Sequence, residues 1–253
     1  MTRATLNTAL AWVGFLLMLL SLAWLESLPR RPRPAVGATT TPNRSPFPLV
    51  ILDPGHGGQD SGAMCAGIME KELTLDVAQR LERRLREYGL GTLMTRTGDA
   101  YVSLADRARL AERARDCIMV SIHFNEGNKP VSTGIETYYA DRQKGTGGTF
   151  LASLLPFLQP VSSDGPNIKS QSLAGFIQDS LVTRTHAVNR GTKTQQFFVL
   201  ANVHHPAVLV EGGFISNKDD AIKLASADYR EDIAAAITDG ILHYCEVVKS
   251  EPR

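Results

Sequence analysis

The sequence predicts an α/β fold, with a single three-layer domain whose mostly parallel, twisted β-sheet of about six strands is flanked by helices. Two observations carry this prediction. Short apolar runs alternate along the chain with amphipathic segments, in which apolar residues recur every three or four positions. Glycines, prolines and polar capping residues separate these segments. The 253 residues, 43% of them hydrophobic and 21% charged, suit one globular domain with additional segments.

A hydrophobic segment precedes the domain. From Ala9 to Leu25, 17 consecutive residues carry no charge, and most of them are large and apolar. This length lies at the lower limit for a membrane-spanning helix and at the upper end for the core of a signal peptide. Residues 1–28 are therefore predicted to be a signal peptide or a membrane anchor. Residues 29–48, rich in Pro, Thr and Arg, predict an extended linker.

The predicted domain spans residues 49–248 and begins with a strand at Leu49–Leu52. Apolar residues at three- and four-residue steps then predict an amphipathic helix that ends at Gly89. These residues are Leu73, Val77, Leu81, Leu85 and Tyr88. A short strand at Thr92–Thr95 follows the helix.

The middle of the domain continues this alternation. Ser103 and Asp106 form a capping box at the start of a helix that runs through Arg115. Apolar, aromatic and β-branched residues predict strands at Ile118–Ile122 and Gly134–Tyr139.

A third group of elements completes the domain. Ser172–Val188 is predicted as a helix, and Phe197–Leu200 and Ala207–Val210 are predicted as strands. Two final helices are predicted from capping pairs. The pairs are Asn217 with Asp220 and Asp228 with Glu231.

Residues 143–169 do not follow the alternation. A Gly/Thr loop leads into an apolar run, Phe150–Leu158, that contains Pro156. One interpretation is a kinked helix packed on the surface. The other is an insertion that acts as a flap or a regulatory helix beside the functional site.

Charge and cysteine content narrow the class of protein. Without residues 1–46 the chain carries 22 Lys and Arg against 25 Asp and Glu, a net charge of −3. The domain therefore lacks the basic character of nucleic-acid-binding proteins, and no nucleic-acid partner is expected. The three cysteines, an odd number without a CxxC spacing, define no disulfide framework. Cys117 and Cys245 are expected in the core, and only Cys65 lies near candidate chemistry.

Four side chains capable of chemistry stand at the ends of predicted elements. His56 follows the first strand within Asp53-Pro54-Gly55-His56-Gly57-Gly58, and His123 follows the third strand. Glu211 follows the last strand, and Glu70 stands at the start of the first helix. Taken singly, each has another interpretation, such as a solvated histidine in a glycine-rich loop or an acid that favours a helix N-terminus. Taken together, they lie at the edge where open α/β sheets form their sites.

Two histidines and two glutamates at one edge of a sheet fit a catalytic zinc site. Such a site uses three nitrogen or oxygen ligands and leaves a fourth position for water. Zn²⁺ lowers the pKa of this water, and a carboxylate that does not bind the metal can accept its proton and pass it to a leaving amine. The sequence therefore predicts a metal-dependent amidase or peptidase.

These motifs resemble those of the zinc-dependent N-acetylmuramoyl-L-alanine amidases, which are bacterial cell-wall enzymes. The resemblance covers roughly residues 49–246, in the family's order. It rests on residues 53–58, Glu70, Ser121–Asn125 and Val210–Asn217, together with Met94–Arg96, Ser103–Arg107 and Asn189–Gly191. The resemblance implies that His56, Glu70 and His123 are the zinc ligands and that Glu211 is the catalytic carboxylate.

The resemblance also implies a reaction and a place. The reaction is hydrolysis of the amide bond between N-acetylmuramic acid and L-alanine in bacterial peptidoglycan, with release of stem peptides. The protein would be exported to the cell envelope, secreted or anchored by its N-terminus in the periplasm or on the outer face of the cytoplasmic membrane. Asn125, Arg190 and Asn217 are candidate substrate-binding residues. A protein activator that acts on residues 143–169 and a monomeric state are further expectations.

Two alternatives stay open. One is a catalytically silent peptidoglycan-binding module with the same fold. The other is a thiol hydrolase with Cys65 as nucleophile and His56 or His123 as base. In addition, Phe124 replaces the small residue that is usual in the family, and is expected to change the pocket beside His123.

Overall fold

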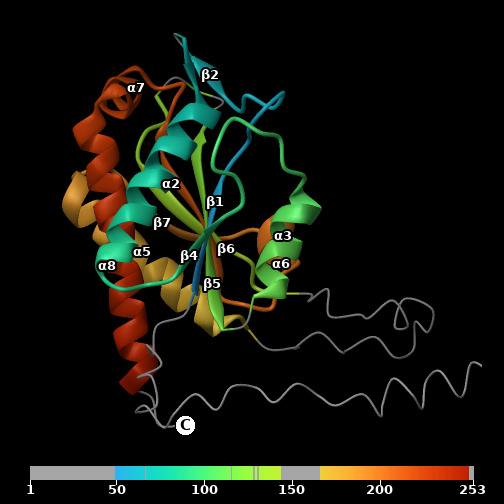
Figure 1. The fold of residues 1–253 in the computed structure, drawn as a ribbon. Coiled ribbons are helices and arrows are strands. Elements are labelled where there is room, and N and C mark those ends of the chain that lie inside the picture. The colour runs from blue at the N-terminus through green and yellow to red at the C-terminus, as the bar shows by residue number, and fades with distance from the viewer. Residues whose placement is uncertain are drawn as a thin grey trace, which may run out of the picture. The chain divides into compact units, whose positions relative to one another are not determined.

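The computed structural model describes residues 49–143 and 166–250, apart from Ala66, Arg115, Asn128 and Pro130. The described residues form a three-layer α/β domain around a six-stranded sheet (Figure 1). The strand order in this sheet is β4-β1-β5-β8-β6-β7. The predicted fold class is therefore confirmed.

The sheet is mixed but mostly parallel. The pairs β1–β4, β1–β5, β5–β8 and β6–β7 are parallel, whereas β6 runs antiparallel to β8. The strands are β1 (Leu49–Pro54), β4 (Thr92–Met94), β5 (Cys117–Asn125), β6 (Ile135–Tyr139), β7 (Asn189–Thr194) and β8 (Ala207–Phe214). A separate hairpin, β2 (Met64–Cys65) with β3 (Ile68–Met69), connects β1 to the first helix.

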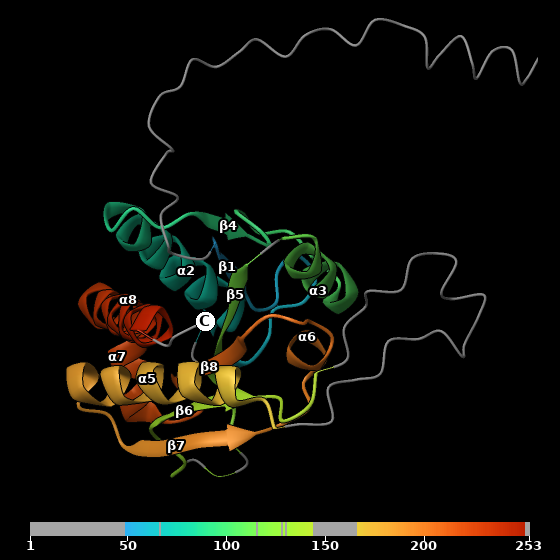
Figure 2. The same ribbon diagram turned by 90° about the horizontal axis from the view of Figure 1, so that it is seen from below.

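Helices cover both faces of the sheet (Figure 2). One face carries α2 (Glu70–Glu87), α5 (Ile168–Thr185) and α8 (Ala227–Ser250). The other face carries the shorter helices α3 (Leu104–Arg113) and α6 (Phe198–Ala201), and α7 (Lys218–Ala225) follows β8. Because side chains alternate along a strand, each strand contributes to two cores. Val208 and Val210 of β8 belong to the larger core under α2, α5 and α8, and Leu209 belongs to the smaller core under α3 and α6.

Two predicted elements differ from the structure. Phe197–Leu200, predicted as a strand, contributes instead to the one-turn helix α6, because an apolar run of four residues has no period that separates strand from helix. The sixth strand is β7, which the sequence did not predict. Its residues are polar and mostly exposed, so it lacks the apolar pattern used to find strands and joins the sheet through its backbone at an edge.

Helix starts are confirmed for two of the three predicted caps. The side chains of Ser103 and Asn217 accept backbone hydrogen bonds at the starts of α3 and α7. Asp228 does not cap α8, which begins one residue earlier. Its first turn is closed by a hydrogen bond from Arg230 N–H to the Ser226 carbonyl.

Several predicted segments lie outside the described residues. They are the N-terminal segment 1–28, the linker 29–48 and residues 144–165 of the insertion. The described ends of the insertion lie together, because Asn167 donates hydrogen bonds to the carbonyls of Ala140 and Asp141. Within the ranges that the structure describes, no helix combines the length and the apolar content that a membrane crossing requires.

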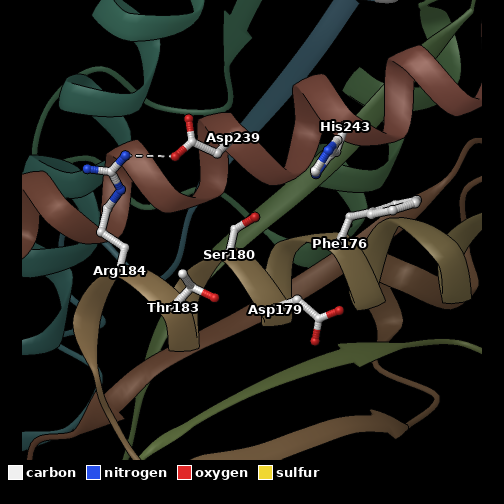
Figure 3. A pocket seen from close by; sticks show the side chains of 7 residues that line it. All are labelled: Phe176, Asp179, Ser180, Thr183, Arg184, Asp239 and His243. Carbon is white, nitrogen blue, oxygen red and sulfur yellow. Dashed lines mark hydrogen bonds and ion pairs between the residues drawn. The ribbon is translucent and has the colours of Figure 1, made fainter.

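The helices α5 and α8 border a groove of about 560 Å³ (Figure 3). Arg184 of α5 donates to Asp239 of α8 at 2.8 Å, and the rings of Phe176 and His243 lie 5.7 Å apart. The ion pair is largely exposed, so it contributes little to stability. This groove lies on the helical layer opposite α3 and α6.

Candidate metal centre and active site

The loop after β1 carries His56 to the C-terminal edge of the sheet. His56 has a left-handed backbone, with a φ of 59°, which is rare for a residue other than glycine. Gly55 precedes it, and a Cβ added at Gly55 would overlap the His123 imidazole. A glycine is therefore required here for the loop to lie against the histidine of β5.

Two buried arginines hold this loop by its carbonyl groups. Arg107 donates to the carbonyls of Pro54 and His56, each at 2.7 Å. Arg96 donates to the Gly55 carbonyl at 2.8 Å. The sequence indicated no role for either arginine, because nothing in the motifs shows that their side chains turn inward. The structure makes them the support of the His56 backbone.

Asp53 forms a buried ion pair with Arg107. The Arg107 guanidinium lies 2.6 Å from Asp53 Oδ1, and the two side chains are 4% and 1% exposed. Thr95 and Ser121 each donate a hydroxyl hydrogen bond of 2.7 Å to the same carboxylate. The buried carboxylate therefore joins β1, the end of β4, β5 and α3 beneath the loop.

Glu70, the first residue of α2, connects the two histidines. Its carboxylate oxygens lie 3.0 Å from His56 Nε2 and 2.9 Å from His123 Nδ1. The backbone N–H groups of Ala63 and Phe124 donate to the same carboxylate at 2.9 and 3.1 Å. Burial by itself raises the pKa of Glu70, but its hydrogen bonds with His123 and His56 outweigh burial and hold this pKa far below the usual range.

The structure brings together the three residues predicted as metal ligands. Donor atoms of His56, Glu70 and His123 all lie within 4.8 Å of one another. Two imidazoles and one carboxylate form the donor set of a catalytic zinc site. His56 Nδ1 lies 2.9 Å from Asp60 Oδ2, so Asp60 can orient the ring while Nε2 faces Glu70.

Glu211 lies beside this cluster on the neighbouring strand. It stands opposite His123 in the β5–β8 pairing. Its Oε2 atom is buried and makes no hydrogen bond within the described residues. Burial of the carboxyl group, and then the charges of Glu70 and Glu136, raise the pKa of Glu211 well above its ordinary value. Such an unpartnered polar atom costs free energy, which indicates a site rather than a structural contact.

His56, His123 and Glu211 line one cavity of about 240 Å³. Much of the remaining wall is apolar and comes from α3, α6 and the segments that precede them. These residues are Tyr101, Val102, Leu104, Phe197, Phe198 and Val199. A concave, largely apolar pocket with a few convergent polar groups is the usual form of an active site.

Comparison with known proteins decides the family. A family model described as N-acetylmuramoyl-L-alanine amidase matches residues 50–243. The chain belongs to the N-acetylmuramoyl-L-alanine amidase family. The predicted resemblance is therefore confirmed, and so is the predicted enzyme class, a hydrolase of the cell-wall amide bond for which the family is named.

Individual relatives agree with this assignment. The amidase LytC of Bacillus subtilis is 36% identical over 215 residues, which cover 83% of this chain but only 39% of LytC. The amidase AmiC2 of Nostoc punctiforme has a solved structure with 33% identity and a TM-score of 0.66, over 79% of this chain and 97% of that one. The CwlD amidase of Clostridioides difficile, solved in complex with the GerS lipoprotein, has 26% identity and a TM-score of 0.67, over 79% and 99%.

The three candidate substrate-binding residues of this amidase occupy two places. Asn125 and Arg190 both donate to Glu136, at 2.8 and 2.7 Å. Asn217 caps α7, where its side chain accepts hydrogen bonds from the backbone. None of the three is among the residues that line the cavity of the amidase.

Glu136 is a residue that the sequence reasoning missed. It lies in β6 with 2% of its surface exposed, opposite Glu211 in the β6–β8 pairing. A signal for it was present, because Glu136 is an acid within the strand-like run Ile135–Tyr139. An acid in a buried strand is costly unless it is paired or at a site, so this residue could have been selected from the sequence.

The remaining predicted residues of the amidase lie in its core. Cys117 and Cys245 are buried as expected, and burial raises the pKa of the Cys117 thiol to about 12 and that of Cys245 to about 11. Cys65 packs against the larger core and does not line the cavity with the histidines. Phe124, which was expected to change the pocket beside His123, lies in the larger core, is 1% exposed and is not among the residues that line the cavity.

Proposed function

We propose that this amidase hydrolyses the bond between N-acetylmuramic acid and L-alanine with Zn²⁺ bound by His56, Glu70 and His123. The observation that supports the proposal most directly is Oε2 of Glu211, which is buried and without a partner in the described part of the chain. Glu211 lies on the strand that pairs with the strand of His123, and donor atoms of His56, Glu70 and His123 are within 4.8 Å of one another.

The donor set fits Zn²⁺ in number and in type. Three nitrogen or oxygen ligands with an open fourth position are typical of catalytic zinc sites. Glu70 is held by two backbone N–H groups, and His56 by Asp60, as metal ligands commonly are. When bound, Zn²⁺ supplies a water of lowered pKa and polarises a carbonyl oxygen.

Glu211 is proposed to move the proton. Its unpartnered Oε2 can accept a proton from the attacking water and donate it to the amide nitrogen as L-alanine leaves. Adjacent strands lie about 4.8 Å apart, so the pairing with His123 supports a position of this oxygen beside the proposed ligand set. The position of β8 between β5 and β6 supports this role, because both neighbouring strands restrain the strand that carries the carboxylate.

The other parts of the chain are proposed to serve access to the cell wall. Residues 1–28 direct or anchor the protein to the cell envelope, residues 29–48 tether it, and the domain that follows acts on peptidoglycan as a monomer. CwlD occurs in complex with a lipoprotein. This supports a protein partner for the present chain, and we propose that the partner is an activator that acts at residues 143–169. Deletion of residues 146–168 is then expected to raise activity on purified sacculi, and unchanged or lower activity would contradict it.

Mass spectrometry of the products from purified sacculi tests the proposed reaction. We expect free stem peptides that begin with L-alanine, together with glycan that has lost its peptides. A chelator should abolish their release and added Zn²⁺ should restore it, while iodoacetamide should have no effect. Inhibition by iodoacetamide with resistance to chelator would favour the thiol hydrolase based on Cys65. Binding of sacculi without release of peptides would favour the catalytically silent module.

A further inference from the structure

A cluster of charged and polar side chains surrounds Glu136 next to the active site. Asn125 Nδ2 and the Tyr138 hydroxyl donate to one carboxylate oxygen, at 2.8 and 2.7 Å. Arg190 Nε donates to the other oxygen at 2.7 Å, and Lys193 Nζ also donates to it. We call these five residues the Glu136 cluster. One carboxylate faces two cations, so the cluster carries a net charge of +1.

The sheet places this cluster in line with the proposed catalytic residues. His123 stands opposite Glu211 across β5 and β8, and Glu211 stands opposite Glu136 across β8 and β6. Residues paired in this way project from the same face of a sheet. With about 4.8 Å between strands, Glu136 lies one strand beyond Glu211 and two strands beyond His123. The Glu136 cluster therefore lies beside Glu211 on the side away from His56, next to the cavity that Glu211 lines and not in its wall.

The two cations of the cluster are fixed in position but remain accessible. Arg190 uses only Nε to bind Glu136, and its guanidinium carbon lies 4.9 Å from the centre of the Phe214 ring. Within the described residues, its two terminal nitrogens donate no hydrogen bond. The side chains of Arg190 and Lys193 are 34% and 37% exposed. A guanidinium held in place with its outer donors free suits a carboxylate, which it can bind by two parallel hydrogen bonds.

Neutralising Glu136 requires one cation, and the second leaves a positive charge that no carboxylate of the cluster balances. The substrate of the proposed reaction offers anions on one side of the bond only. The lactyl carboxyl group of N-acetylmuramic acid is already consumed in the amide, and the sugar itself is neutral. The peptide, by contrast, carries free carboxylates. The positive charge beside Glu211 therefore matches the peptide part of the substrate.

We propose that Arg190 and Lys193 bind a carboxylate of the peptide, within two or three residues of the bond that is cleaved. This inference rests on the proposed function, because it places the peptide beside Glu211. Two strand spacings amount to about 10 Å, and an extended peptide covers about 3.3–3.6 Å per residue. Asn125 and Tyr138 serve as positioning residues, since they fix the carboxylate of Glu136 on which both cations rest.

Two substrates that differ in one group test this inference. Both are N-acetylmuramoyl-L-alanyl peptides, and the residue after L-alanine carries a free carboxylate in one and a carboxamide in the other. A charge-assisted hydrogen bond supports about a 10- to 100-fold preference of the zinc-loaded enzyme for the carboxylate, expressed mainly in KM. In Arg190→Gln this preference should fall to near unity, because kcat/KM should fall much more for the carboxylate substrate than for the carboxamide substrate. Arg190→Lys should restore part of it.

Arg184→Met provides a matched control, because it removes an exposed, ion-paired arginine on the opposite helical layer (Figure 3). It should leave the preference intact. A second measurement needs no variant: free alanyl-glutamate should inhibit the enzyme more strongly than alanyl-glutamine amide, in which both carboxyl groups are replaced by carboxamides.

Equal use of the two substrates by the unaltered enzyme would overturn the inference and leave the proposed function standing. An equal fall in kcat/KM on both substrates in Arg190→Gln would overturn it as well, since it would show that Arg190 only neutralises Glu136. Failure to release peptide from either substrate, in the unaltered enzyme with Zn²⁺, would instead refute the proposed function on which the inference rests.

Discussion

Replacing Arg107 with methionine tests how the His56 loop is held. The variant keeps a long, unbranched side chain but removes the cation that lies 2.6 Å from Asp53 and donates to the carbonyls of Pro54 and His56. Asp53 would then be a buried carboxylate supported only by the hydroxyls of Thr95 and Ser121. Removing one partner of a buried ion pair costs about 3–5 kcal/mol, so Arg107→Met should lower the free energy of unfolding by this amount.

A double-mutant cycle separates the ion pair from the carbonyl contacts. Asp53→Asn removes the negative charge and keeps an oxygen acceptor, so the double variant no longer contains an unpaired buried charge. The free energy of unfolding lost in the two single variants, added together, should therefore exceed the free energy lost in the double variant by about 1–3 kcal/mol. The loss of the donor to the His56 carbonyl remains in both backgrounds, and it should lower zinc affinity by about 10- to 100-fold.

Urea unfolding in the presence of Zn²⁺ measures the free energy of unfolding, and competition with a chelator of known affinity measures the zinc affinity. Arg109→Met is the control on the same helix, because Arg109 and its partner Asp106 are each more than half exposed. It should change stability by no more than about 0.5 kcal/mol. Strictly additive losses, or unchanged zinc affinity in Arg107→Met, would refute the argument that the buried arginine positions the ligand loop.

Three further predictions concern the site and the surface. Glu211→Gln should keep zinc, measured by metal analysis, and lose turnover by about 10²- to 10⁴-fold, whereas His123→Ala should lose both; near-normal hydrolysis by Glu211→Gln would remove Glu211 from its proposed role. Gly55→Ala should weaken zinc binding by at least about tenfold, because its Cβ would overlap the His123 ring, while Gly98→Ala, with open space around its Cβ, should not. Burial raises the pKa values of Asp76 and Glu231, but their bonds to arginines outweigh it and hold both pKa values below their ordinary values. Their contribution to stability is therefore present above the unfolded pKa values and lost as pH falls through the folded ones. Between about pH 5 and pH 3, Asp76→Asn with Glu231→Gln should flatten the decline of the melting temperature, and an unchanged slope would contradict it.

Periodicity identified those elements whose side chains meet the core. The helix marked by Leu73, Val77, Leu81 and Leu85 is α2, and all four residues are buried. The same criterion could not find β7, because an exposed edge strand needs only backbone partners and carries no apolar signature. It also misassigned Phe197–Leu200, where four apolar residues serve a single helical turn.

The sequence by itself determined the chemical types of the site. His56, His123 and Glu211 could be selected because they follow predicted strands, at the edge where open α/β sheets form their sites, and Glu70 because it starts the first helix. The tertiary structure decided how these residues act on one another. Arg96 and Arg107 turn inward beneath the loop, Glu70 lies between the histidines, and Oε2 of Glu211 is left without a partner in the described residues.

The Glu136 cluster belongs to the tertiary structure alone. Glu136 and Arg190 are 54 residues apart in the chain, and they meet because β6 reverses direction against β8 and then pairs with β7. Local sequence carries the preference of each residue for strand, helix or turn, but contacts across a sheet depend on which strands pair and in which register. That register places Glu211 between His123 and Glu136. The proposed metal ligands therefore lie on one side of Glu211, and Arg190 and Lys193 lie on the other.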